Sequence, residues 1–285
     1  MCGRYAASAD PDELIEIFEV DHDATADPAR SLLKNPQQPP AGRPDYNVAP
    51  SKAAPAVVQR PARDDREASR QLRLLSWGLV PPWSKDTSSS VRMINARAET
   101  LLSTRAYAKA ARARRCLVPA TGWYEWQASP VATTSKGKPR KQPFFIGRVD
   151  DTTLAMAGVY EFWKAPDGAR HESTDTEEAR EDPAWLVTFA IVTTVAEPGL
   201  DRIHARQPVV LDQDRWDDWL DPALQDPTRV EALLASPKPG RFVTWPVSTA
   251  VNAVANNDPA LTQALPPEEL VAVVDPHTGE ILGQT

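Results

Sequence analysis

Cysteine is scarce in this sequence, and the scarcity limits the kinds of site that the chain can build. Only Cys2 and Cys116 occur among its 285 residues, which is too few for a disulfide framework or a cysteine-based zinc cluster. A chain without disulfides is typical of a reducing compartment, where the thiol of Cys2 would stay free. We therefore expect a cytoplasmic protein that holds no metal and no cofactor.

Long apolar segments are also missing. The longest one, "WLVTFAIVTTVA" at 185–196, is short for a membrane span and contains three threonines. No basic and then apolar leader precedes the first predicted helix. Hydrophobic residues make up 41% of the chain and charged residues 25%, which is typical of a globular protein. We expect no membrane partner and a monomer.

Lysine and arginine are absent from two segments near the chain ends, although the net charge of the whole chain is only −7. Residues 5–29 carry −8, residues 242–285 carry −5, and an acidic segment at 165–182 carries another −5. The rest of the chain therefore carries +11. Such a basic region is either a solvated surface or a face that binds nucleic acid. Its densest part sets seven cations against one acid, Glu99: Arg92, Arg97, Arg105, Lys109, Arg112, Arg114 and Arg115.

Two helices are predicted from local patterns. The first covers 10–18, with Asp10 as its N-cap and Pro11 at its first position. The second covers 98–115, and its spacing places Arg105, Lys109 and Arg112 on one face.

Short runs of apolar, β-branched and aromatic residues predict at least seven strands, with 115–126 as one continuous run. Because strands and helices do not alternate regularly, we expect an α+β fold whose mixed β-sheet is strongly bent, barrel-like and flanked by helices. Polar stretches near 128–141 and 165–182 predict surface insertions in a single domain over residues 1–285.

The residue after the initiator methionine is the first candidate for chemistry. Initiator methionine is usually removed before a small residue, and removal of Met1 would leave Cys2 with a free α-amine beside its thiol. With a pKa of about 8, roughly a tenth or more of such an amine is neutral and nucleophilic at neutral pH. An aminothiol condenses with an aldehyde to a Schiff base, and the thiol then closes a thiazolidine ring. The alternative is that Cys2 has no chemical role.

Two other titratable residues stand in apolar surroundings. Glu125 lies in "GWYEW" and is either buried, with a pKa raised toward neutrality, or exposed on an edge strand. A buried carboxyl of this kind suits proton transfer in both directions. His204 is one of four histidines and the only one beside both an arginine and an apolar strand. It is either a catalytic or a structural histidine.

The segment "INARAET" at 94–100 places an amide two residues before a guanidinium. In an extended chain Asn95 and Arg97 point to one side, where the amide would orient a reacting group and the guanidinium would bind a phosphate. Otherwise the segment begins a helix with a surface arginine. Trp77 and Trp83 flank a Pro-Pro turn and are either core residues or a platform for unpaired bases.

Taken together, several motifs resemble those of the SRAP family, named for SOS-response-associated peptidases and now understood as abasic-site processing proteins. In chain order the motifs are "MCGRY", "YNVAPS", "WGLVPPW", "INARAET", "RCLVPATGWYEW", "QPFFI" and "IHARQPVVL". They run from residue 1 to about residue 211, and "WPVSTAVNAVANND" near 245–258 extends the similarity almost to the end.

The resemblance implies an enzyme of DNA repair that links its N-terminal cysteine covalently to the ring-opened aldehyde of an abasic site in single-stranded DNA. It implies a lyase-like activity and, from the peptidase name, a self-catalysed removal of Met1 as one route to the free cysteine. The family's catalytic residues correspond to Cys2, Asn95, Glu125 as acid and base, and His204. Its DNA-contacting positions correspond to Arg4, Asn47, Arg97 and Arg206, with Pro50 and Trp83 as walls against flanking bases.

Three other functions remain open from the residues alone. N-terminal-nucleophile amidohydrolases also begin Met-Cys-Gly, but they use an Asn-Gly oxyanion pair, and this sequence has no "NG" dipeptide. A cysteine peptidase would use Cys2 with His204. A noncatalytic single-strand binding module would bind abasic DNA only reversibly.

Overall fold

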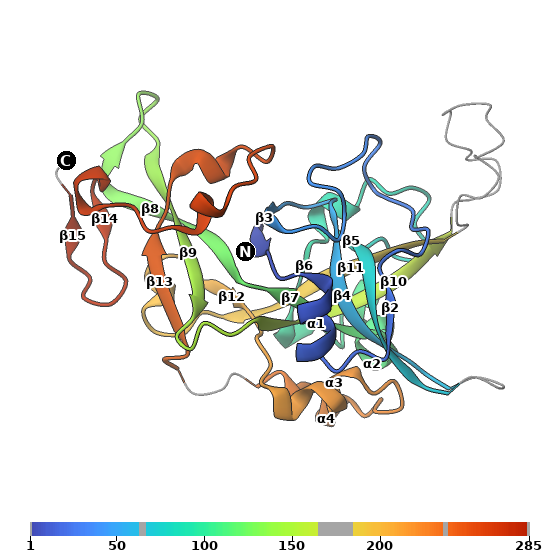
Figure 1. The fold of residues 1–285 in the computed structure, drawn as a ribbon. Helices are drawn as coiled ribbons and strands as arrows, with labels where there is room; N and C mark the ends of the chain where they lie inside the picture. Colours follow the sequence, from blue (N-terminus) through green and yellow to red (C-terminus); the bar gives the residue numbers. More distant parts are fainter. Residues whose placement is uncertain (1, 63–66, 165–184, 236–238, 284–285) are drawn as a thin grey trace.

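Two large β-sheets lie side by side, and the N-terminus of the chain lies between them (Figure 1). The computed structural model describes residues 2–62, 67–164, 185–235 and 239–283. The insertion predicted at 165–182 lies outside these residues. The insertion predicted near 128–141 is the outer part of a β-hairpin.

The larger sheet closes into a five-stranded barrel. Its ring runs β11–β10–β7–β4–β5, and a parallel pairing of Thr188 with Ser76 and of Phe189 with Trp77 joins β5 back to β11. The ring strands are β4 (Ala53–Arg60), β5 (Ser69–Trp77), β7 (Arg115–Ala120), β10 (Leu154–Lys164) and β11 (Trp185–Val195). The other four pairings within the ring are antiparallel, so the barrel is mixed, as predicted.

Three short strands extend the barrel sheet. They are β2 (His22–Ala24), β6 (Asn95–Arg97) and β12 (Arg206–Pro208). β2 pairs with β5, whereas β6 and β12 both pair with β11. Because Thr193 of β11 pairs with Arg97 and Val195 pairs with Arg206, two arginines that are distant in sequence flank the same end of one strand.

The second sheet is antiparallel and has the order β13–β9–β8–β1–β3. Its strands are β1 (Tyr5–Ala7), β3 (Asp45–Val48), β8 (Gly122–Thr133), β9 (Pro139–Arg148) and β13 (Phe242–Pro246). A separate two-stranded ladder follows near the C-terminus, with β14 (Val273–Val274) and β15 (Ile281–Leu282).

Alternating side chains of the barrel divide the core into two parts. Cys116 and Val118 of β7 face an inner core that also holds Cys2 and Trp123, so this core joins the barrel to the second sheet. Leu117 faces an outer core covered by the helices. The helices are α1 (Pro11–Ile17), α2 (Arg105–Ala113), α3 (Trp216–Leu220) and α4 (Pro227–Leu233). The α+β class and the helix-flanked, barrel-like sheet are therefore confirmed.

Two local predictions need correction. The helix predicted over 98–115 begins at Arg105, after a 3₁₀ turn at Ala98–Thr100, because fully buried Leu101 packs in the outer core and Thr104 is extended. The strand predicted over 115–126 is two strands in different sheets. The chain turns at Gly122, where a Cβ would lie 2.3 Å from the Phe145 ring and 2.5 Å from the Ile146 carbonyl oxygen.

Candidate active site

Cys2 lies fully buried between the two sheets, and its backbone is held by the barrel. The Asn95 Nδ2 donates a 2.7 Å hydrogen bond to the Cys2 carbonyl oxygen. Asn95 is itself positioned by β6 and by Tyr107 of α2, whose hydroxyl donates to the Asn95 carbonyl oxygen at 3.1 Å. The Oδ1 atom of Asn95 is buried and has no hydrogen-bond partner within the described residues. An acceptor therefore lies beside the backbone of Cys2.

Glu125 projects from β8 into the same region, and burial dominates its chemistry. Its exposed fraction is 4%, so the edge-strand alternative does not hold for this residue. Burial raises the pKa of Glu125 to about 7. Burial, and next the charge of Glu125, raise the pKa of the Cys2 thiol far above its usual value. At neutral pH the Cys2 sulfur is thus a thiol, and after burial the charge of Glu125 has the largest influence on its pKa.

His204 comes from the turn before β12 and meets Glu125 across the sheets. Its Nδ1 lies 3.9 Å from the Glu125 Oε1 and accepts the backbone N–H of Arg206 at 3.1 Å. Burial lowers the pKa of His204, so the ring is neutral at pH 7. The same Nδ1 lies 3.2 Å from the Arg206 carbonyl oxygen, to which it donates in the other tautomer of the neutral ring.

Glu125 and His204 line a small pocket, whereas Cys2 and Asn95 are not among its lining residues. The apolar lining residues are Trp123, Ile146, Leu200 and Ile203, and the polar ones are Glu125, His204, Arg206 and Gln207. The apolar neighbours are the physical reason that the Glu125 carboxyl is desolvated and holds its proton up to neutral pH.

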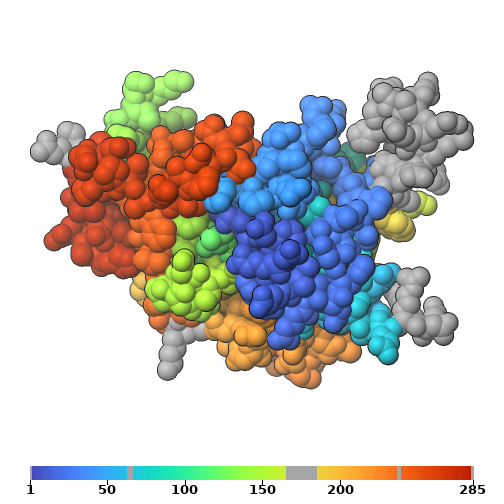
Figure 2. Space-filling view, viewed as in Figure 1, coloured from blue at the N-terminus to red at the C-terminus, as the bar shows by residue number. Residues whose placement is uncertain are grey.

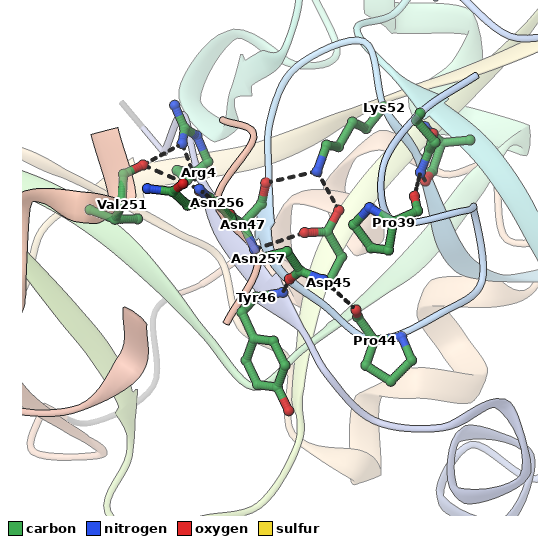
Figure 3. Close-up of polar contacts among 12 residues, drawn as sticks. Arg4, Pro39, Pro44, Asp45, Tyr46, Asn47, Lys52, Val251, Asn256 and Asn257 are labelled. Atoms are coloured by element: carbon green, nitrogen blue, oxygen red, sulfur yellow. Dashed lines mark hydrogen bonds and ion pairs between the residues drawn. The ribbon is translucent and has the colours of Figure 1, made fainter. Parts of the chain in front are cut away.

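Arg4 is anchored beside the site by a fully buried asparagine (Figure 3). The Arg4 Nη1 donates to the Asn47 Oδ1 at 2.6 Å and to the Val251 carbonyl oxygen at 2.8 Å. The Asn47 amide in turn donates to the carbonyl oxygens of Val251, Ala253 and Asn256. Asn47 has no exposed surface, so it acts on the outside only through Arg4 and the loop at 250–257.

The other predicted contact residues differ in how they are held. The Arg206 guanidinium makes a two-pronged ion pair with Glu99, at 2.7 and 2.9 Å, and bonds the Thr193 carbonyl oxygen. Arg97 is exposed on β6. The Trp83 ring is 49% exposed and lies under the Arg105 guanidinium, whose Cζ is 4.7 Å from the ring centroid. Pro50 is half-buried after β3.

Sequence reasoning missed two residues that position this site. Tyr107 supports Asn95, and Glu99 orients Arg206. A signal for Glu99 was present, because a single acid among seven cations at 91–116 is expected to pair with one of them. No sequence signal separates Tyr107 from an ordinary helix residue.

Metal-binding clusters and membrane-spanning helices are both absent from the described ranges. Within them, no group of three or more histidine, cysteine or acidic side chains is arranged to hold a metal ion. Nor does any helix in that part of the chain have the length and apolar character to span a membrane.

Comparison with known proteins identifies a matching family and several related proteins. The family model described as "SOS response associated peptidase (SRAP)" matches residues 1–254. The abasic site processing protein YoqW of Bacillus subtilis (strain 168) is 32% identical, over 93% of this chain and 100% of its own length. The abasic site processing protein HMCES of Gallus gallus is 32% identical, over 80% of this chain and 67% of its own length.

Solved structures share the fold. A phage-related protein of Bordetella bronchiseptica is 30% identical and matches with a TM-score of 0.56, over 86% of this chain and 94% of its own. A protein of Bacteroides thetaiotaomicron matches with a TM-score of 0.65, over 93% of this chain and 100% of its own. At 21% identity, this match shows only that the two proteins share a fold.

Proposed function

This chain belongs to the SRAP family, and from that premise we propose that it crosslinks itself to abasic sites in single-stranded DNA through Cys2. The product is a thiazolidine, formed after Met1 is removed by a cellular aminopeptidase or by Cys2 itself. The names of the relatives support abasic DNA as the partner. The observation that carries the proposal is the buried Cys2, fastened by Asn95 and electrostatically coupled to a carboxyl with a pKa of about 7.

The proposed reaction uses the α-amine, the thiol and the nearby carboxyl in turn. The neutral α-amine of Cys2 adds to the aldehyde carbon of the opened sugar, and loss of water gives a Schiff base. The thiol then adds to the same carbon and gives up its proton, so the whole reaction forms one C–N and one C–S bond and releases one water. Because the raised pKa of Cys2 leaves no free thiolate, the sulfur needs a base while it adds.

Glu125 supplies both proton transfers. Its protonated carboxyl donates to the leaving hydroxyl, and the resulting carboxylate takes the thiol proton, so the group ends as it began. A pKa of about 7 keeps both forms populated near neutral pH. His204, neutral and 3.9 Å from Glu125, assists the opening of the sugar.

Exposed and half-buried cations beside the pocket bind the strand. Arg97 and Arg206 flank the end of β11, and Arg4 lies two residues after the reacting Cys2. Asn47 is a positioning residue for Arg4, and Pro50 and Trp83 wall off the flanking bases. We take residues 1–285 as one such domain that shields abasic sites in damaged cells.

A cysteine peptidase fits this site less well. Peptidase cysteines carry a depressed pKa from an imidazolium partner, whereas burial raises the pKa of Cys2. The amidohydrolase alternative also lacks its Asn-Gly pair in the sequence.

The test is direct. We expect the protein, mixed with an abasic single-stranded oligonucleotide, to give a heat-stable adduct whose mass equals protein without Met1 plus DNA minus one water. An undamaged oligonucleotide of the same sequence is the control. If all the DNA is released on heating in denaturant, the protein binds the abasic strand only reversibly. That result would make it a binding module and not an enzyme.

Arg97→Ala is expected to weaken binding of undamaged single strands and to flatten the plot of log affinity against log salt. The slope should change by about 0.7, because one single-strand phosphate contact releases its counterions. Arg229→Ala, an exposed cation on α4, is the matched control and should leave the slope unchanged. Equal slopes for both variants would remove Arg97 from the DNA-binding face.

A further inference from the structure

The β8–β9 hairpin carries a concentrated positive charge that the proposed crosslinking does not use. Residues 128–149 contain five cations and no acid, in a chain whose net charge is −7. Four of the five lie close to the tip: Lys136, Lys138, Arg140 and Lys141. We call these four residues the basic tip. Lys136, Lys138 and Lys141 are exposed, and the hairpin stands clear of the molecule at the top of Figure 2.

The hairpin is a rigid extension of the strand that carries Glu125. β8 and β9 pair continuously from Glu125 with Phe144 to Ala128 with Lys141. Between the Glu125–Phe144 pair and the Thr133–Pro139 pair β9 advances five residues, or about 17 Å at 3.3 Å per residue. β8 uses eight residues over the same span, because its register shifts between Ala128 and Thr133. The tip turn passes through Gly137 at a φ of +70°, and a Cβ added there would have nothing within 4 Å, so the turn meets only solvent.

Two side-chain contacts fix the base of the hairpin relative to the pocket. Gln127 bonds both the backbone of Val274 and the Arg202 carbonyl oxygen, next to the turn that holds His204. The Ser129 hydroxyl donates to the Ala272 carbonyl oxygen at 2.9 Å. The basic tip therefore has a set place on one side of the site. The charge of Lys141 reaches the site itself, since it lowers the pKa of both Glu125 and His204, in each case as a minor cause behind burial.

From this geometry we propose that the basic tip is a second DNA-binding subsite, which holds backbone phosphates of the strand on one flank of the abasic nucleotide. The proposal rests on the proposed function for the position of that nucleotide. A reach of about 17 Å places the basic tip beyond the nucleotides that directly flank the abasic one. Lysines on an exposed hairpin suit phosphate, because they attract charge without reading bases. The subsite thus adds affinity for longer strands without adding sequence preference.

The test compares two triple variants that remove the same charge. Lys136→Ala/Lys138→Ala/Arg140→Ala removes three of the four charges of the basic tip and spares Lys141, whose charge acts on Glu125. Arg60→Ala/Lys164→Ala/Arg229→Ala removes exposed cations at the ends of β4 and β10 and on α4, away from the hairpin (Figure 1). Each protein is titrated by fluorescence anisotropy with an undamaged single strand of about twenty nucleotides, long enough to span the reach, over a range of salt concentrations.

We expect the tip variant to flatten the log-log salt slope by about 2, three contacts at about 0.7 each, and the control variant to leave it unchanged. Crosslinking rates are then measured at low protein concentration with an abasic trinucleotide and with abasic strands extended on the 5′ or the 3′ side. The tip variant should match the wild type on the trinucleotide and lose rate on one extended strand only.

Three results would overturn the proposal: a slope unchanged in the tip variant, a slope changed equally in both variants, or an equal loss of rate on both extended strands. A wild-type protein that fails to crosslink even the trinucleotide would refute the proposed function instead. The anisotropy slopes still decide the role of the basic tip in that case, because binding to the undamaged strand does not need the covalent step.

Discussion

No heat-stable adduct is expected from Cys2→Ala with abasic single-stranded DNA, whereas a Schiff base trapped by borohydride should still form. The variant keeps a free α-amine at the same place but has no sulfur to close the ring, and a Schiff base alone hydrolyses when the protein is denatured. The measurement is a denaturing gel with and without borohydride. A stable band without reductant would exclude the thiazolidine.

The complementary variant blocks the amine and keeps the thiol. A bulky residue inserted between Met1 and Cys2 should prevent removal of the methionine, which intact mass confirms. The Cys2 nitrogen is then an amide whose lone pair is delocalised into the peptide bond, so it is not a nucleophile. The thiol alone forms only a readily reversible hemithioacetal. This protein should bind single strands and yet give no adduct; a heat-stable band from it would mean that the α-amine does not react.

Glu125→Gln is expected to slow adduct formation by about 10²-fold or more, the usual cost of losing an acid–base group. Glutamine keeps the size and most of the hydrogen bonding but transfers no proton, and the neutral side chain is compatible with a buried site. His204→Ala is the comparison variant and should cost less, because sugar opening also proceeds unaided. A Glu125→Gln protein that crosslinks at the wild-type rate would make Glu125 a structural residue.

The pH dependence of the crosslinking rate is a second test of Glu125 as the acid and base. Below about pH 8 the α-amine becomes protonated and stops attacking, while above about pH 7 Glu125 loses the proton that helps water to leave. The wild-type rate should therefore be bell-shaped, with its maximum between the two values. In Glu125→Gln the fall on the alkaline side should disappear, and the acid side should stay.

Much of the fold was predictable from local patterns. α1 begins at Pro11 after Asp10, as the capping pattern predicts. The apolar runs at 53–59, 142–149 and 185–194 each lie within a strand or overlap one almost entirely, in β4, β9 and β11. Prediction failed where distant residues decide the backbone. The run at 115–126 reads as one strand, but Gly122 admits the Phe145 ring and sends the chain from the barrel into the second sheet.

The chemistry of the site divides in the same way. The cysteine that follows Met1, the carboxyl among aromatics in "GWYEW" and the basic middle of the chain belong to the covalent structure, so the sequence by itself determined which reactions and which partner to consider. Whether Glu125 was buried or exposed could not be read locally, because both edge and central strands accept the same alternating pattern.

Only the tertiary structure decided how these groups act together. Glu125 and His204 are 79 positions apart in the sequence and 3.9 Å apart in space, and Asn95 reaches Cys2 only because β6 pairs with β11. Asn47, read from its motif as a contact to DNA, is fully buried and holds Arg4. Such pairings depend on sheet closure and on the desolvation that follows it, and desolvation is what moves the pKa of Glu125 to about 7. A sequence lists the groups that can titrate, but their pKa values belong to the packed molecule.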